Sequence, residues 1–212
     1  MIECVIFDCD GTLVDSEPLA NLGLEIMLRD YGVQRTAASL EREYKGWKLA
    51  NVCASLEAHH TIALRETFVP EYRALLAKLF DERLEAIPGV EQALASIALP
   101  KCVASSGPPE KIQQTLRLTG LDRFFGENIF SSYVIGSWKP DPELFLHAAK
   151  AMGFAPESCA VVEDSELGIQ AARNAGMQAY WYTSEPIKSD MEGVVSFNSM
   201  SQLGGLLTKK IR

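Results

Sequence analysis

The chain has 212 residues, of which 47% are apolar, and it carries a net charge of −8. This length suits one large domain or two modest ones, and the mixture of apolar and charged residues predicts a globular protein. The acidic balance argues against nucleic acid or an anionic membrane as a partner, because both attract a basic surface. The sequence gives no sign of an obligate protein partner.

The cysteines and the N-terminal residues predict the cellular compartment of the protein. The five cysteines, Cys4, Cys9, Cys53, Cys102 and Cys159, form no C-x-x-C pair. Three of them lie in apolar runs, so we interpret them as small buried hydrophobes. The sequence shows no apolar run of about 18 residues and no basic segment leading into an apolar one at the start. We therefore expect a cytoplasmic protein, with Lys209–Arg212 as a solvated tail.

The first predicted strand, Glu3–Asp8, runs directly into a pair of carboxylates. Asp8 ends the strand, and Asp10 follows with one residue between them, just before Gly11. Like charges repel, and an unpaired buried carboxylate is costly, so the pair needs a compensating cation. A hard divalent ion such as Mg²⁺, which prefers oxygen ligands, meets that need.

No strand pattern appears between residues 17 and 85. The stretches 17–31, 36–45, 47–60 and 66–84 all have helical patterns. We predict a helical cap domain, residues 17–85, inserted into a catalytic α/β core domain made of residues 1–16 and 86–212. The cap leaves and rejoins the core near Ser16 and Glu85, which places two hinges beside each other.

The later strands are apolar runs without alternation, as expected for strands buried on both faces. They are Lys101–Ser106, Asn128–Ser132, Cys159–Asp164, Gln178–Thr183 and a weaker Val194–Phe197. Helical patterns separate them, so the sequence predicts an α/β fold with a doubly wound, parallel, Rossmann-like sheet. Asp141 with Pro142 predicts one helix start, Gly153 predicts its end, and Ser165 predicts the next start.

In an open parallel sheet, ligands bind beyond the carboxyl ends of the strands. Polar residues lie in pairs at such ends: Asp8 with Asp10, Ser105 with Ser106, and Glu163 with Asp164. Asp164 is a natural third Mg²⁺ ligand, and Glu163 is expected to hold a coordinated water or to orient the ligands. Because the helical insertion begins at this edge, we expect it to cover the site as a lid.

Together these motifs resemble the haloacid dehalogenase (HAD)-like superfamily, and within it the capped branch of phosphatases and β-phosphoglucomutases. The segments "DCDGT", "VASS", "SWKPDP" and "VVEDSELG" are similar to its first, second, third and fourth motifs, and the resemblance covers nearly the whole chain. It implies Asp8 as nucleophile, Asp10 as general acid and base, Lys139 as a catalytic cation, and Ser105 on the phosphate. The implied Mg²⁺ ligands are the Asp8 and Asp164 side chains and the Asp10 backbone carbonyl, with Glu163 beside them.

The implied activity is hydrolysis of a small phosphorylated metabolite through an aspartyl phosphate on Asp8. Mg²⁺ and Lys139 would offset the repulsion between the phosphate and the attacking carboxylate. Gly11 lets the backbone approach the phosphate closely, and the N–H groups of Gly11 and Ser106 are expected to donate to it.

Two alternatives stay open. A β-phosphoglucomutase-type enzyme carries a cap-edge histidine after its first motif, which Ala20 and its neighbours do not provide, and a lysine soon after the second-motif serine, where this chain has "GPPEK". We therefore favour hydrolysis over mutase activity. The other alternative is a regulatory protein that kept this fold and lost its activity, although every catalytic position is filled.

The cap is expected to select the substrate. Lys45 and Lys48 flank Gly46 and Trp47 in "YKGWKL", which resembles the specificity stretch of the family's caps. These lysines could equally be exposed residues at a helix–helix corner. If one of them meets a second anionic group, the resemblance favours sugar phosphates with a carboxylate opposite the phosphate, 6-phosphogluconate among them.

Overall fold

The computed structural model describes residues 1–183, 191 and 193–208. The predicted tail Lys209–Arg212 lies outside the described residues. The chain divides into two compact units, which we call the core unit (Met1–Val14 with Ala86–Arg212) and the helical unit (Asp15–Glu85). The assignment of catalysis to one unit and of a covering role to the other stays a prediction.

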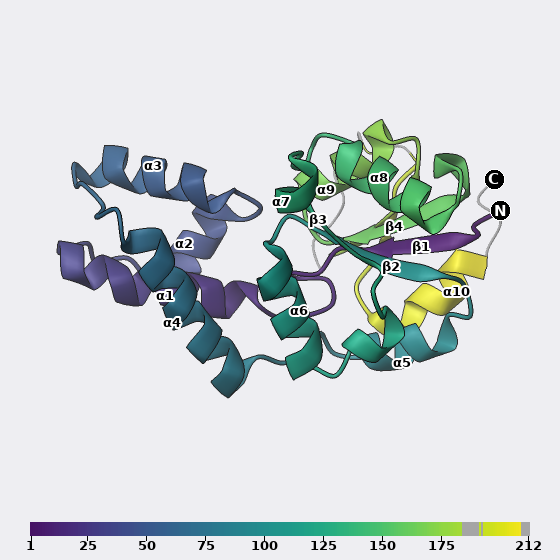
Figure 1. Ribbon diagram of the computed structural model, residues 1–212, viewed down its shortest axis with the longest axis horizontal. Coiled ribbons are helices and arrows are strands. Elements are labelled where there is room, and N and C mark those ends of the chain that lie inside the picture. The colour runs from purple at the N-terminus through teal and green to yellow at the C-terminus, as the bar shows by residue number, and fades with distance from the viewer. Residues whose placement is uncertain (184–190, 192, 209–212) are drawn as a thin grey trace. The chain divides into compact units, whose positions relative to one another are not determined.

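The core unit contains a parallel sheet of six strands within the described residues, in the order β3-β2-β1-β4-β5-β6 (Figure 1). The strands are β1 Cys4–Phe7, β2 Lys101–Ser105, β3 Ile129–Ser131, β4 Cys159–Glu163, β5 Gln178–Tyr182 and β6 Val195–Phe197. Every predicted strand is present, and the predicted doubly wound parallel sheet is confirmed. The order reverses direction at β1, and ligands bind beyond the strand ends at such a reversal.

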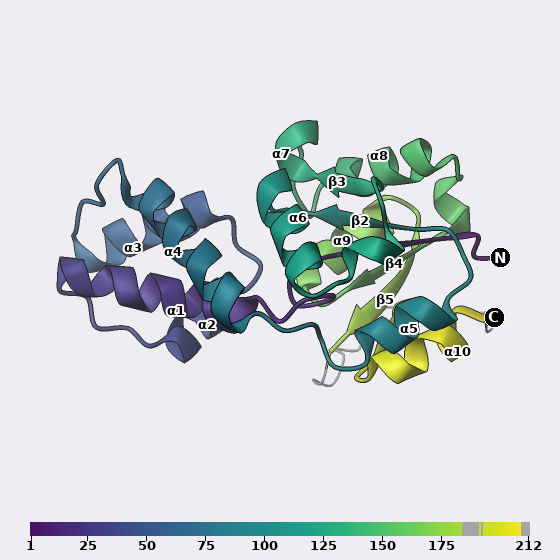
Figure 2. The same ribbon diagram turned by 60° about the horizontal axis from the view of Figure 1, so that its bottom comes forward.

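Helices cover both faces of this sheet. They are α5 Val90–Ser96, α6 Pro109–Leu118, α7 Ser132–Ile135, α8 Glu143–Met152, α9 Glu166–Asn174 and α10 Leu203–Thr208. Helices α8 and α9 lie on one face, whereas α5 and α10 lie on the other (Figures 1 and 2). On a strand, successive side chains point to opposite faces. Accordingly, Ile6 packs in the cluster with α8 and α9, whereas its neighbour Phe7 makes an edge-on contact with Phe125.

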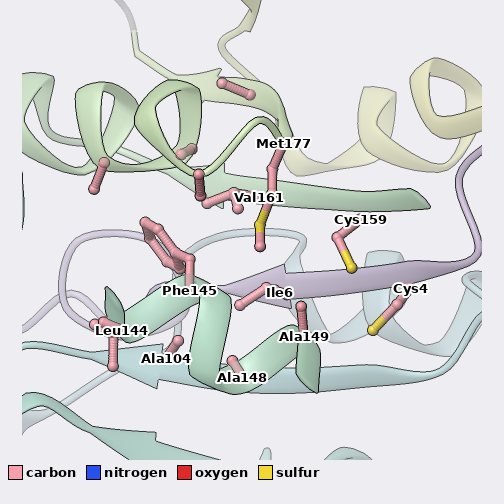
Figure 3. Close-up of a cluster of buried hydrophobic side chains, with 14 of the residues drawn as sticks. Cys4, Ile6, Ala104, Leu144, Phe145, Ala148, Ala149, Cys159, Val161 and Met177 are labelled. Atoms are coloured by element: carbon pink, nitrogen blue, oxygen red, sulfur yellow. The ribbon is translucent and has the colours of Figure 1, made fainter. Parts of the chain in front are cut away.

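A buried apolar cluster lies between the sheet and the helices α8 and α9. Leu144, Phe145, Ala148 and Ala149 of α8 face the strands (Figure 3). The small alanines let the helix approach the sheet closely, and Cys4 and Cys159 fill the space beside them. The predicted role of the strand cysteines as buried hydrophobes is confirmed, because Cys4, Cys102 and Cys159 are all fully buried.

The helix ends follow local side-chain chemistry. Ser165 begins α9 as predicted, because its Oγ accepts the Gly168 N–H at 3.1 Å. Gly153 ends α8 in the left-handed conformation, at φ 82°. The predicted start of α8 is wrong by one residue: Pro142, not Asp141, is the N-cap. The Pro142 carbonyl accepts the Leu146 N–H at 3.0 Å, so the helical bonding begins there.

The helical unit consists of α1 Glu17–Leu28, a 3₁₀ turn Arg29–Tyr31, α2 Ala37–Tyr44, α3 Leu49–His60 and α4 Phe68–Arg83. Each of the four predicted helices is present, although the first ends in the 3₁₀ turn. Their apolar faces meet in a core that includes Leu28, Leu40, Leu56 and Phe80. Among the described residues, no helix combines the length and the apolar character that crossing a membrane requires.

Candidate active site

Two buried acidic side chains lie at the carboxyl ends of neighbouring strands. Asp8 follows β1 directly, and Glu163 is the last residue of β4. The strands pair in parallel with Phe7 opposite Val162, and the Asp8 N–H donates to the Val162 carbonyl at 2.9 Å. This register places Asp8 and Glu163 side by side, with exposed fractions of only 5% and 1%.

Asp164 completes a cluster of three carboxylates. Asp8, Glu163 and Asp164 each place a carboxylate oxygen within 4.8 Å of the others. Burial raises the pKa of the Asp8 carboxyl well above its ordinary value; Lys139 opposes this rise, whereas the neighbouring carboxylates add to it. Asp8 therefore holds its proton more tightly than an exposed aspartate does.

Lys139 is the buried cation of this cluster. It comes from the loop between α7 and α8, and its Nζ donates to Asp8 Oδ1 and, at 2.8 Å, to Glu163 Oε1. The ammonium also lies 5.1 Å from the centre of the Phe145 ring. Burial lowers the pKa of Lys139, but the two carboxylates outweigh it and hold that pKa above its ordinary value. Lys139 therefore keeps its charge beside Asp8.

Glu163 connects Lys139 to the start of α9. Its Oε1 accepts from Lys139, and its Oε2 accepts the Ser165 N–H at 2.6 Å and the Ser165 hydroxyl at 2.9 Å. The carboxyl lies directly against α9, where a Cβ on Gly168 would be 2.0 Å from Glu163 Cδ. Both oxygens thus have protein donors, which favours the orienting role expected for Glu163.

The turn after Asp8 is shaped to approach Asp164. Gly11 has φ +76°, and a Cβ there would lie 2.6 Å from Asp164 Oδ2. Its N–H donates to the Val14 carbonyl at 2.9 Å, and the expected donation from Gly11 to a phosphate stays a prediction. Thr12, which the sequence analysis did not assign, donates its hydroxyl to Asp164 Oδ1 at 3.3 Å.

Asp10 has a partner that the sequence analysis missed. Lys111, on the first turn of α6, donates from Nζ to Asp10 Oδ1 at 2.7 Å. The carboxyl group of Asp10 therefore has a cation separate from that of Asp8. One signal was available in the sequence. A cation in the first turn of a helix interacts unfavourably with the helix dipole, so a lysine at this position indicates a stabilising contact with another part of the chain.

Ser105 lies at the same edge of the sheet. It ends β2, which pairs with β1, and it is 1% exposed. Its Oγ accepts the Gly107 N–H at 3.1 Å, so the side chain shapes the turn into α6. A hydroxyl that accepts one hydrogen bond still has a proton to donate, and Ser106 follows it in the same turn. The phosphate-binding role of Ser105 and Ser106 stays a prediction.

The remaining predicted site residues, Lys45 and Lys48, belong to the helical unit. Lys45 follows α2 as its C-cap, and Lys48 precedes α3 as its N-cap. Trp47, between them, is half exposed and makes an edge-on contact with the Tyr44 ring. The role of the two lysines in substrate binding stays a prediction.

The donor set of the core unit fits a hard divalent cation. The cluster offers only carboxylate oxygens, which are the ligands that Mg²⁺ prefers. Lys139 pairs with Asp8 and Glu163, and Asp164 adds a third carboxylate, so the cluster can accept further positive charge. The backbone carbonyl of Asp10 stays a predicted ligand. The residues present therefore match the predicted Mg²⁺ site.

Comparison with known proteins identifies the class that this fold and site define. A family model for haloacid dehalogenase-like hydrolases matches residues 2–176, and the chain belongs to that family. A crystal structure of a haloacid dehalogenase-like protein from Agrobacterium tumefaciens aligns with a TM-score of 0.85 and 29% identity, covering 98% of each chain.

Two curated relatives narrow the class. The chain is 38% identical to a 6-phosphogluconate phosphatase from Escherichia coli, over 95% of this chain and 93% of the relative. It is 31% identical to a phosphorylated carbohydrates phosphatase from Thermotoga maritima, over 84% of this chain and 83% of the relative. Within its family, the protein is therefore a phosphatase, a phosphoric monoester hydrolase.

Proposed function

We propose that this phosphatase hydrolyses small sugar phosphates and phosphorylated sugar acids, 6-phosphogluconate among them, through an aspartyl phosphate on Asp8 and with Mg²⁺ as cofactor. The cluster of Asp8, Glu163 and Asp164, in which Lys139 pairs with Asp8 and Glu163, carries this proposal, because it joins a nucleophile to the charges that phosphoryl transfer requires. The substrates for which these two relatives are named support the substrate class.

The reaction has two displacements at phosphorus. In the first, the Asp8 carboxylate forms a bond to phosphorus while the ester P–O bond breaks, and Asp10 gives its proton to the leaving oxygen. In the second, Asp10 takes a proton from water as the water oxygen attacks phosphorus and the bond to Asp8 breaks. Free phosphate leaves, and both aspartates return to their starting states.

Fixed positive charge makes the first displacement possible. A phosphate dianion and a carboxylate repel each other, and the Lys139 ammonium, held beside Asp8, offsets that repulsion. The side chains of Asp8 and Asp164 and the backbone carbonyl of Asp10 would hold Mg²⁺, with Glu163 orienting the site. When bound, Mg²⁺ supplies further positive charge to the phosphate oxygens. Ser105 and Ser106 bind the phosphate.

Lys45 and Lys48 give the proposal its substrate preference. Both lie in the short connection between α2 and α3, and we assign one of them to a carboxylate at the far end of the substrate. A phosphorylated sugar acid has its anionic groups at opposite ends, which fits this assignment. The cytoplasmic location stays a prediction from the sequence.

A phosphate-release screen over sugar phosphates and phosphorylated sugar acids, with Mg²⁺ and with a chelator, tests the proposal. We expect release that depends on Mg²⁺ and disappears in Asp8→Asn. Asp122→Asn, which changes an exposed aspartate, is the matched control and should keep full activity. Normal turnover by Asp8→Asn would remove Asp8 from the reaction.

The same screen separates the alternatives. A mutase would convert a sugar phosphate to its isomer when a sugar 1,6-bisphosphate is added, with little free phosphate. An inactive regulatory protein would release no phosphate from any ester, an aryl phosphate included.

A further inference from the structure

A salt bridge outside the carboxylate cluster holds Asp10. Lys111 Nζ lies 2.7 Å from Asp10 Oδ1, and the two side chains are 24% and 18% exposed. The residues are 101 positions apart in the sequence, so this contact exists only because the turn after β1 and the start of α6 meet at one edge of the sheet. It joins Asp10, the acid–base candidate of the core unit, to α6.

Lys111 occupies a position that local helix energetics disfavour. The N-cap of α6 is Pro108 and its first helical residue is Pro109, so Lys111 lies in the first turn, where unpaired N–H groups make the helix end positive. An acidic residue is favoured there, and Glu110 supplies one. The contact with Asp10 compensates for the placement of Lys111.

The site thus divides its cations between its aspartates. Lys139 donates to Asp8 and to Glu163, whereas Lys111 donates to Asp10. The carboxyl group of Asp10 is not a member of the three-carboxylate cluster. Two lysines from different elements therefore hold the nucleophile and the acid–base candidate in separate places.

We propose that Lys111 is a positioning residue that fixes the carboxyl group of Asp10 for proton transfer to the leaving group; this inference rests on the proposed function. Lys111 donates to Oδ1 and thereby orients the carboxyl group. As the ester P–O bond breaks, the proton of the Asp10 carboxyl group moves to the leaving oxygen, and a proton returns to Asp10 from the attacking water in the second step. Lys111 keeps its own protons throughout.

Phosphate esters whose leaving groups differ in acidity test whether Lys111 acts through Asp10. An alkoxide leaves poorly without a proton, whereas p-nitrophenolate leaves without one, so only the alkyl ester depends strongly on Asp10. The ratio kcat/KM includes every step up to departure of the leaving group. A lysine that acts through Asp10 therefore affects kcat/KM for alkyl phosphates more than for p-nitrophenyl phosphate.

The experiment compares Lys111→Met, Lys111→Arg and wild type on a sugar phosphate, phenyl phosphate and p-nitrophenyl phosphate, all with Mg²⁺. We expect Lys111→Met to lower kcat/KM about 100-fold for the sugar phosphate and less than about fivefold for p-nitrophenyl phosphate. Lys111→Arg should restore most of the loss. Lys150→Met, which changes an exposed lysine on α8, is the control and should match wild type.

A double variant closes the test. If Lys111 acts through Asp10, then Lys111→Met should add almost no further loss in an Asp10→Asn background. An equal loss for all leaving groups, or additive losses in the double variant, would overturn the inference and point to phosphate binding or to folding. If wild type released phosphate from none of the esters, the proposed function would fail together with this inference.

Discussion

Replacing Gly168 by alanine tests how Glu163 is held. Gly168 lies inside α9, and a Cβ at this position would be 2.0 Å from Glu163 Cδ and 2.1 Å from Oε1. The methyl group therefore displaces a carboxyl that holds Lys139 and the Ser165 backbone. Glycine is required here by the close approach of a buried side chain, and not by the helix itself.

The expected loss of stability follows from competing terms. Overpacking a buried site costs about 1–3 kcal/mol, and hydrogen bonds lost by the displaced Glu163 carboxyl cost a further ~1–3 kcal/mol. Alanine returns roughly 0.5–1 kcal/mol, because it favours a helix more than glycine does. The net loss is about 3 kcal/mol, which corresponds to a fall in Tm of roughly 6–12 °C for a protein of this size.

Thermal unfolding and phosphatase assays on the same samples check this result. Gly205→Ala is the control, since Gly205 also lies in a helix, α10, and a Cβ there has no atom within 4 Å. That control should be neutral or slightly stabilising, whereas Gly168→Ala should lose stability and about 100-fold in kcat/KM, because Lys139 shifts. Equal Tm and activity for the two variants would refute the packing argument.

Other predictions concern the carboxylates and the cap. Gly11→Ala should abolish Mg²⁺-dependent thermal stabilisation, since its Cβ would lie 2.6 Å from Asp164 Oδ2; unchanged stabilisation would contradict this. Burial raises the pKa of Asp8 in the folded protein. The protonated Asp8 therefore contributes fully to stability below the pKa of the unfolded chain, about 3.9, and this contribution is lost as the pH rises through the pKa of the folded protein. Urea titrations with a chelator should therefore show a steeper decline with pH for wild type than for Asp8→Asn, and parallel curves would count against it. Lys48→Ala should raise KM for acidic sugar phosphates more than for neutral ones, and equal changes would reject the cap-lysine assignment.

The strands could be predicted because they are buried on both faces. Runs such as Cys159–Glu163 are apolar at every position, and that pattern needs no tertiary information. Helix limits depended on single residues, and there the local signals were less reliable. Asp141 was predicted as the N-cap of α8, but Pro142 takes that place.

The site could be predicted where its residues lie at strand ends. Asp8, Glu163 and Asp164 come together because parallel strands end at one edge, so their positions follow from the motifs and the topology. Lys111 and Thr12 were missed, because the first lies on a helix 101 residues from its partner and the second contacts Asp164 across 152 positions. No local sequence pattern predicts a contact between residues so far apart in the chain.

The sequence by itself determined the parallel sheet and the helical insertion, since apolar periodicity is a local property of the chain, and the type of chemistry followed from the resemblance of its motifs to a known family. Only the tertiary structure decided which charge neutralises which: Lys139 serves Asp8 and Glu163, and Lys111 serves Asp10. Gly11 and Gly168 likewise became meaningful only once Asp164 and Glu163 were seen against them. The physical reason is that ion pairs and close contacts depend on distances between segments, and those distances are set when the sheet assembles.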